Sequence, residues 1–161
     1  MKLDEFNSLA PEEAAAVVRP CADVPAWIDE VVAARPYADL GELIEVAQVA
    51  AEGWSDAEVD AALAQHPRIG ERAQGDDAEA ALSRSEQSSM SGLDAEIAAG
   101  NRAYEEKFGR IFLIRAAGRS ATDVLDQLTT RLGHDAATES AVVAHQLKEI
   151  ALLRLEGMIS V

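Results

Sequence analysis

Three observations predict an all-α fold. Apolar residues make up 48% of the chain but aromatic residues only 4%, so the core must be aliphatic and rich in alanine, the best helix former. Apolar residues recur at helical spacing through most of the chain. One apolar run between glycines, 108–118, departs from this pattern, and no second strand is evident to pair with it. We therefore predict a single domain, 1–161, with about eight helices and a buried irregular connector near 108–118.

Start and stop signals place each helix. Pro11 suits a first helical position, and Pro20 ends that helix. Asp39, Asp77 and Ser120 are N-cap residues, and Ser55-Asp56-Ala57-Glu58 matches a capping box. Loops are predicted at 75–77 and 88–92. The predicted helices are 11–19, 24–35, 40–52, 56–65, 78–86, 93–107, 121–132 and 136–158.

The charge balance excludes some partners. The chain has 29 acidic and 14 basic residues and a formal net charge of −15. A nucleic acid needs Lys and Arg to replace its counterions, and an anionic membrane surface also attracts basic segments. We therefore predict no nucleic-acid partner and no membrane partner.

The single cysteine and the N-terminal sequence indicate a location. Cys21 has no second cysteine for an internal disulfide, which favours a reducing compartment. The N-terminal residues are acidic, unlike a signal peptide, and no run of 18 apolar residues is present. The prediction is a soluble cytoplasmic protein.

His66 and Pro67 are the first candidate for chemistry. The residue before a proline is disfavoured in α geometry, so the preceding helix should end at His66. Pro67 fixes the exit of the chain and Gly70 allows an unusual dihedral, which together would hold the imidazole in place. A histidine can give or take a proton near neutral pH. A helix-end histidine that only balances the helix dipole is the alternative interpretation.

Ser83, Glu86 and Gln87 are the second candidate. At spacing i, i+3 and i+4 they share one helix face and can hold a ring that carries amide groups. Glu86 can also orient and charge-stabilise an imidazole. A solvated helix face is the competing interpretation.

Arg154 is the third candidate, because it interrupts the apolar run Ile150 to Leu155. A ligand carboxylate would satisfy its guanidinium in two-pronged fashion, and an internal ion pair would do so equally well. A metal site built from His134, His145 and Glu149 is a weaker hypothesis, since neither an HExxH pattern nor a cysteine pair is present.

Together these motifs resemble one known family. They are HPRIGE at 66–71, the S-x-x-E-Q pattern at 83–87, NRAYEEKFGRIFLIRAAGRS at 101–120 and RLGHDAATESAVVAHQLKEIALLRL at 131–155, with LDEFNSLAPEEA at 3–14. The chain is similar over nearly its whole length to the 2-oxo-4-hydroxy-4-carboxy-5-ureidoimidazoline (OHCU) decarboxylases of urate breakdown. The resemblance implies an all-α homodimer that uses no metal and no organic cofactor.

The resemblance also implies a reaction and a set of site residues. The substrate would lose CO2 and be protonated on one face, giving (S)-allantoin. His66 would be the proton donor, with Glu86 beside it as the second catalytic residue. The substrate site would comprise Pro67, Ser83, Gln87, Phe112, Ile114, Ala116 and Arg154. The alternative function is a non-enzymatic helical interaction module whose acidic surface docks a basic partner; it accounts for the charge but not for His66-Pro67 or Arg154.

Overall fold

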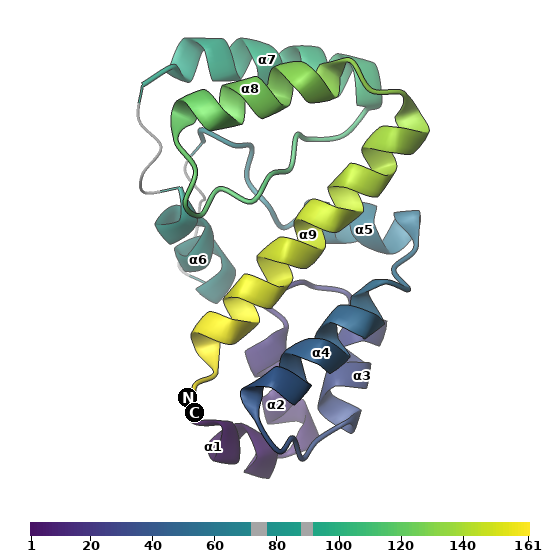
Figure 1. The fold of residues 1–161 in the computed structure, drawn as a ribbon, viewed down its shortest axis with the longest axis vertical. Coiled ribbons are helices and arrows are strands. Elements are labelled where there is room, and N and C mark those ends of the chain that lie inside the picture. The colour runs from purple at the N-terminus through teal and green to yellow at the C-terminus, as the bar shows by residue number, and fades with distance from the viewer. Residues whose placement is uncertain (72–76, 88–91) are drawn as a thin grey trace. The chain divides into compact units, whose positions relative to one another are not determined.

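Helices account for nearly all regular structure in the computed structural model, which describes residues 1–71, 77–87 and 92–161 (Figure 1). In these residues the only β pairing is an isolated bridge between Lys2 and Ser160. The predicted all-α class is therefore confirmed. The helices of the described residues are α1 (Leu3–Ser8), α2 (Pro11–Val18), α3 (Pro25–Ala33), α4 (Leu40–Ala51), α5 (Asp56–Leu63), α6 (Ala78–Glu86), α7 (Asp94–Phe108), α8 (Ala121–Leu132) and α9 (Ala136–Met158).

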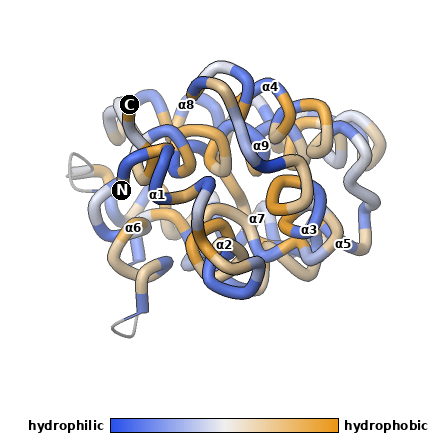
Figure 2. The backbone as a smooth tube through the Cα atoms, turned by 90° about the horizontal axis from the view of Figure 1, so that it is seen from below, coloured by the Kyte–Doolittle hydropathy of each residue, from blue (hydrophilic) through white to orange (hydrophobic). Residues whose placement is uncertain are grey.

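The chain forms two compact units. The first comprises residues 1–62 and 148–161, and the second comprises residues 63–147. Hydrophilic and hydrophobic bands alternate along the helices (Figure 2), as expected for helices that bury one face. No helix in the described part of the chain is long and apolar enough to cross a membrane.

The first unit is built on α2, α3 and α4, where α2 packs on α3 and α3 packs on α4. Trp27 is buried at the centre of this packing, and its indole Nε1 donates to the carbonyl of Ala47 at 2.8 Å. Its ring meets the ring of Trp54 edge-on at 5.7 Å. Both tryptophans of the chain therefore belong to one aromatic contact inside the first unit.

The helix starts follow the predicted caps. The carboxylate of Asp39 accepts the amide of Glu42 at 2.9 Å, and that of Asp77 accepts the amide of Ala80 at 2.8 Å. Ser55 and Glu58 form the predicted capping box, with reciprocal bonds of 3.1 and 3.0 Å. Side-chain acceptors thus satisfy amides that the first helical turn leaves unpaired. Helix α9 has the predicted bounds.

The bounds of α2, α3, α4 and α7 differ from the prediction by one or two residues at an end, and two further differences have a structural reason. Helix α1 was not predicted, because its six residues contain only two buried apolar side chains, Leu3 and Phe6, and Lys2 is an atypical cap. Helix α5 ends at Leu63 rather than running into Gln65, and the amide of His66 bonds to the carbonyl of Leu63 at 3.0 Å. Because Pro67 disfavours α geometry at His66, the chain after Leu63 forms a tighter turn with an i→i−3 hydrogen bond in place of a further α-helical turn. The predicted loop at 75–77 and the predicted break at 88–92 lie mostly outside the described residues.

The second unit contains the predicted connector. Helices α7 and α8 lie side by side (Figure 1), and the chain between them has no regular secondary structure from Ile111 to Ala116. It is bounded by Gly109 and Gly118, both at positive φ, which allows the chain to leave α7 and turn toward α8. The expectation of a buried irregular connector is confirmed. Its buried side chains join a cluster made of Ile69, Ile97, Tyr104, Phe112, Ile114, Ala116, Ala121, Val124 and Leu128.

The close approach of α7 and α8 depends on Gly100. A Cβ at this position would overlap Cδ2 of Leu128, which is fully buried. We expect Gly100→Ala to lower the free energy of unfolding by about 1–2 kcal/mol, because overpacking exceeds the gain in helix propensity. Urea unfolding measures the effect. Gly157→Ala is the matched control, since nothing lies within 4 Å of its added Cβ in α9, and it should stabilise the chain slightly. A stabilised Gly100→Ala variant would contradict this packing.

Candidate active site

His66 is held at the wall of a cavity in the second unit. Its side chain is only 5% exposed, and its Nε2 lies 3.4 Å from Oε1 of Glu79, whose side chain is 15% exposed. Pro67 follows directly and restricts the backbone on both sides of the bond. The imidazole is therefore fixed against a carboxylate near the end of α5.

Two side-chain contacts hold the backbone that follows His66. The amide of Gly70 donates to Oε1 of Gln87 at 3.0 Å, and Nδ2 of Asn101 donates to the carbonyl of Ile69 at 2.9 Å. Gly70 has φ +85°, a conformation that other residues rarely adopt. Asn101 is buried, and Ile69 packs into the apolar cluster. The segment from His66 to Gly70 is thus attached to both α6 and α7.

Helix α6 runs beside this segment. Glu79, Ser83 and Glu86 lie at i, i+4 and i+7 of the helix and so share one face. Ser83 is 3% exposed. Glu79 in the first turn contacts His66, and Gln87 at the C-cap contacts Gly70. The two ends of α6 therefore both meet the segment that contains His66.

The cavity has a volume of about 330 Å³, and its lining is more polar than apolar. Its wall includes His66, Pro67, Arg68, Glu71, Asp77 and Glu79, and Ile111 of the connector adds an apolar surface. The guanidinium of Arg68 binds Oε1 of Glu105 at 2.7 Å and lies 4.0 Å from Glu71. The volume suits a small molecule, and the side chains around it can exchange protons.

The predicted connector residues are placed in the apolar cluster with Ile69. Phe112, Ile114 and Ala116 are each 5% exposed or less. The amide of Arg115 donates to Oε1 of Gln146 at 2.9 Å, so a side chain of α9 fixes the backbone here. These residues support the segment behind His66 through Ile69, and their contact with a substrate stays a prediction.

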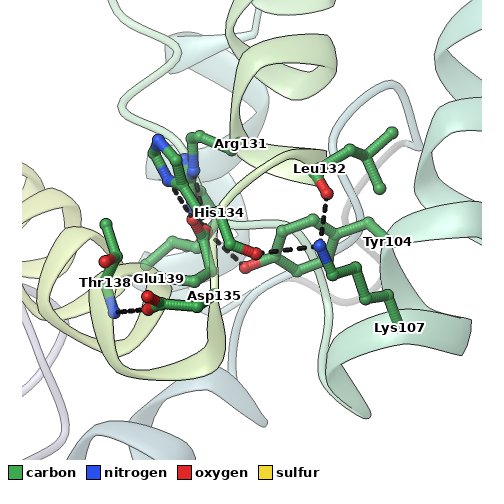
Figure 3. A network of polar contacts seen from close by, with 9 residues as sticks. Tyr104, Lys107, Arg131, Leu132, His134, Asp135, Thr138 and Glu139 are labelled. Carbon is green, nitrogen blue, oxygen red and sulfur yellow. Dashed lines mark hydrogen bonds and ion pairs between the residues drawn. The ribbon is translucent and has the colours of Figure 1, made fainter.

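A buried ionic network anchors the same connector (Figure 3). Glu139 is 1% exposed, and its Oε1 accepts from Nε and Nη2 of Arg131 at 2.8 and 2.6 Å and from the hydroxyl of Tyr104 at 2.5 Å. Its Oε2 lies 3.0 Å from Nδ1 of His134. Nη1 of Arg131 donates to the carbonyl of Leu113 at 2.7 Å. Glu139 thereby links α7 and α8 to α9, and Arg131 of α8 attaches the network to the connector.

The network shifts the ionisation of its members. Burial alone would raise the pKa of Glu139, but hydrogen bonds from Arg131 and Tyr104 and the charge of Arg131 hold it below its usual value. Burial, together with the hydrogen bond to Glu139, raises the pKa of the Tyr104 phenol. At neutral pH the network is therefore an ionised carboxylate with a neutral phenol donor and a guanidinium.

The structure divides the predicted site residues between the units. His66, Pro67, Ser83, Glu86, Gln87, Phe112, Ile114 and Ala116 belong to the second unit, and Arg154 belongs to the first. Arg154 is 3% exposed, and its Nη1 donates to the carbonyl of Pro20 at 2.9 Å. His66 and Pro67 line one cavity, and Gln87 contacts the same segment through Gly70.

Sequence reasoning missed Glu79, Asn101 and the pair Arg131–Glu139. The sequence does indicate that Arg131 is buried, because it lies seven residues after Val124 and three after Leu128, on the apolar face of the same helix. Glu79 and Asn101 carried no such signal. In the part of the chain that the structure describes, no group of three or more His, Cys, Asp or Glu side chains is arranged to hold a metal ion.

The fold and the site define a class of all-α proteins in which a histidine and carboxylates wall a cavity for a small molecule. This chain belongs to the OHCU decarboxylase family, whose model matches residues 7–156. It is therefore a carboxy-lyase, and its substrate is a small molecule.

Individual relatives agree with this assignment. The chain is 31% identical, over 99% of its length, to a 2-oxo-4-hydroxy-4-carboxy-5-ureidoimidazoline decarboxylase of Amia calva, of which the match covers 95%. A crystal structure of OHCU decarboxylase in the presence of (S)-allantoin matches with TM-score 0.70 and 24% identity, over 84% of this chain and 91% of that one. A crystal structure of (S)-allantoin synthase matches with TM-score 0.71 and 18% identity, over 99% of this chain and 54% of that one. At these identities the two structures establish the fold alone.

Proposed function

We propose that the chain converts OHCU to (S)-allantoin in urate breakdown without a cofactor, with His66 as the proton donor. The observation that carries the proposal is the imidazole of His66, nearly buried against Glu79 at the wall of a cavity in a chain of this family. A fixed acid at one wall can reach only one face of a bound ring, which is what a product of single handedness requires.

The chemistry balances without a redox partner. The bond from ring carbon C4 to the carboxylate breaks, CO2 leaves, and the electron pair is delocalised through the ring imine onto the neighbouring carbon C5 and the imine nitrogen, giving an enol. The imidazolium of His66 then gives its proton to C5, which bears the ureido group, and becomes neutral imidazole. The C4 hydroxyl becomes the carbonyl of allantoin as its proton passes to the former imine nitrogen. Directed hydrogen bonds to the developing charge lower the barrier.

The other site residues take binding roles in this proposal. Glu86 is the second catalytic group, either orienting His66 or binding the substrate hydroxyl. Arg154 binds the carboxylate, as its guanidinium in an apolar helical run suggests. The ring and its amide groups are bound by Pro67, Ser83, Gln87, Phe112, Ile114 and Ala116.

We also propose that the enzyme is a cytoplasmic homodimer of one domain, 1–161. The family resemblance supports the dimer, and Cys21, a buried cysteine with no second cysteine in the chain, is consistent with a reducing compartment. The high negative charge disfavours binding to nucleic acid or to an anionic membrane. A solution mass of one chain rather than two would refute the dimer.

A coupled assay tests the activity. Urate is converted by urate oxidase and hydroxyisourate hydrolase, and the purified chain is then added while the circular dichroism of allantoin is recorded. We expect the chain to accelerate the rise of the (S)-allantoin signal, with the same rate after treatment with EDTA. A signal that rises no faster than spontaneous decay would refute the decarboxylase and favour the acidic interaction module. A rate lost with EDTA and restored by metal would refute the cofactor-free reaction.

A further inference from the structure

We infer that Glu79 is the positioning residue of His66, the carboxylate that aims its imidazole and keeps it protonated for proton delivery. The inference rests on the proposed function and adds to it a residue that no motif indicated. Its basis is the approach of Oε1 of Glu79 to Nε2 of His66 at 3.4 Å between two side chains that are 15% and 5% exposed.

The surroundings of His66 make such a partner necessary. A nearly buried imidazole loses hydration when it is charged, so burial by itself favours the neutral form, which cannot donate a proton to a carbanion. A carboxylate 3.4 Å away reverses that preference, because an opposite charge at this distance stabilises the imidazolium. The small exposure of both side chains limits screening by water and salt.

Helix α6 fixes the position of Glu79. Its N-cap is Asp77, whose carboxylate accepts the amide of Ala80, and its C-cap is Gln87, which accepts the amide of Gly70. Glu79 lies in the first turn between these contacts, and Glu86 lies about 10 Å further along the helix axis. The geometry therefore assigns the imidazole to Glu79, and it leaves the substrate hydroxyl as the role of Glu86.

Other charges face the same cavity and must be weighed. The turn that carries His66 contributes Arg68 and Glu71, the N-cap of α6 contributes Asp77 beside Glu79, and the connector contributes the apolar Ile111. Arg68 is paired with Glu105 of α7 at 2.7 Å, which offsets its repulsion of an imidazolium. Among the described ion pairs of His66, the carboxylate partner is that of Glu79.

The pH profile of Glu79→Gln tests the inference. If His66 must be protonated, kcat/KM falls as pH rises through its titration, and the loss of a neighbouring carboxylate moves this fall to lower pH. We expect a shift of about one pH unit for Glu79→Gln, a smaller shift for Glu79→Asp, and none for Glu156→Gln, a control at an exposed carboxylate of α9 outside the cavity wall. A profile of Glu79→Gln that coincides with the wild type overturns the inference.

A second readout does not depend on catalysis. The imidazole C–H resonance of His66 is assigned by its absence from His66→Gln and is titrated in the wild type and in Glu79→Gln. We expect the midpoint to fall by the same amount as the kinetic limb, and an unmoved midpoint overturns the inference. If the wild-type chain fails to accelerate decarboxylation, the proposed function is refuted while the titration still decides whether Glu79 is the partner of His66.

Discussion

Replacing His66 by alanine is expected to lower kcat/KM for OHCU by about 10²–10⁴-fold, the range that a positioned general acid contributes. The carbanion would then take its proton from water, which can approach either face. The residual product should therefore approach a racemic mixture, so the allantoin circular dichroism falls further than substrate consumption does. Both quantities are followed in the coupled assay, with substrate consumption recorded by ultraviolet absorbance.

Two controls separate chemistry from folding. His66→Gln keeps a polar side chain of similar length and should lose the same activity with an unchanged helical spectrum. His145→Ala, at an exposed position of α9, should retain the wild-type rate. A His66→Ala enzyme with nearly full rate and fully (S) product would show that another group delivers the proton.

Replacing Glu139 by glutamine is expected to have the largest effect on stability. The substitution leaves the guanidinium of Arg131, which is 2% exposed, without its carboxylate partner. Breaking a buried pair in this way costs about 3–5 kcal/mol, a large part of the roughly 5–15 kcal/mol that stabilises a domain. Urea unfolding followed by far-ultraviolet circular dichroism measures the loss.

The sign of the pH dependence follows from the lowered pKa of Glu139. A carboxyl group with a lower pKa in the folded state stabilises the protein fully above its unfolded pKa, and this contribution is lost as pH falls through the folded pKa. The wild-type free energy of unfolding should therefore decrease as pH falls below the ordinary glutamate value of 4.5, and Glu139→Gln should show a weaker decrease over that range. Equal slopes for the two proteins would contradict the assigned ionisation.

A double variant tests whether Glu139→Gln lowers the free energy of unfolding because it leaves the charge of Arg131 buried without a partner. Replacing Arg131 by Met and Glu139 by Leu together removes both charges, and buried pairs replaced by apolar residues of similar size are often no less stable. We expect this variant to be more stable than Glu139→Gln. If it is also inactive, the bond from Arg131 to the carbonyl of Leu113 matters for the shape of the connector as well as for folding.

The fold was largely predictable because its signals are local. Asp39, Ser55, Asp77 and Ser120 each accept a backbone amide in the next turn, so four residues suffice to recognise each start. Helix α1 was missed because its first turn is capped by the reach of Glu5 back to the amide of Lys2, without a Ser, Thr, Asp or Asn at the cap. The division of the chain into two units depends on contacts distant in sequence, which no local pattern encodes.

The site was predictable only where its residues are neighbours in the sequence. Pro67 beside His66 indicated a fixed imidazole, and the structure places that imidazole at a cavity wall. The approach of Glu79 to His66 and of Asn101 to Ile69 joins residues 13 and 32 positions apart, through the packing of α6 and α7. Helical periodicity says which face of a helix is buried, but it does not say which polar residue on that face meets which loop.

The edge-to-face pair of Trp27 and Trp54 determines what a fluorescence experiment on this enzyme can see. Both indoles are in the first unit, so tryptophan emission reports the melting of that unit, whereas Tyr104 is the aromatic reporter beside the ionic network of the second. Tryptophan fluorescence would thus report unfolding of the first unit, which does not contain His66.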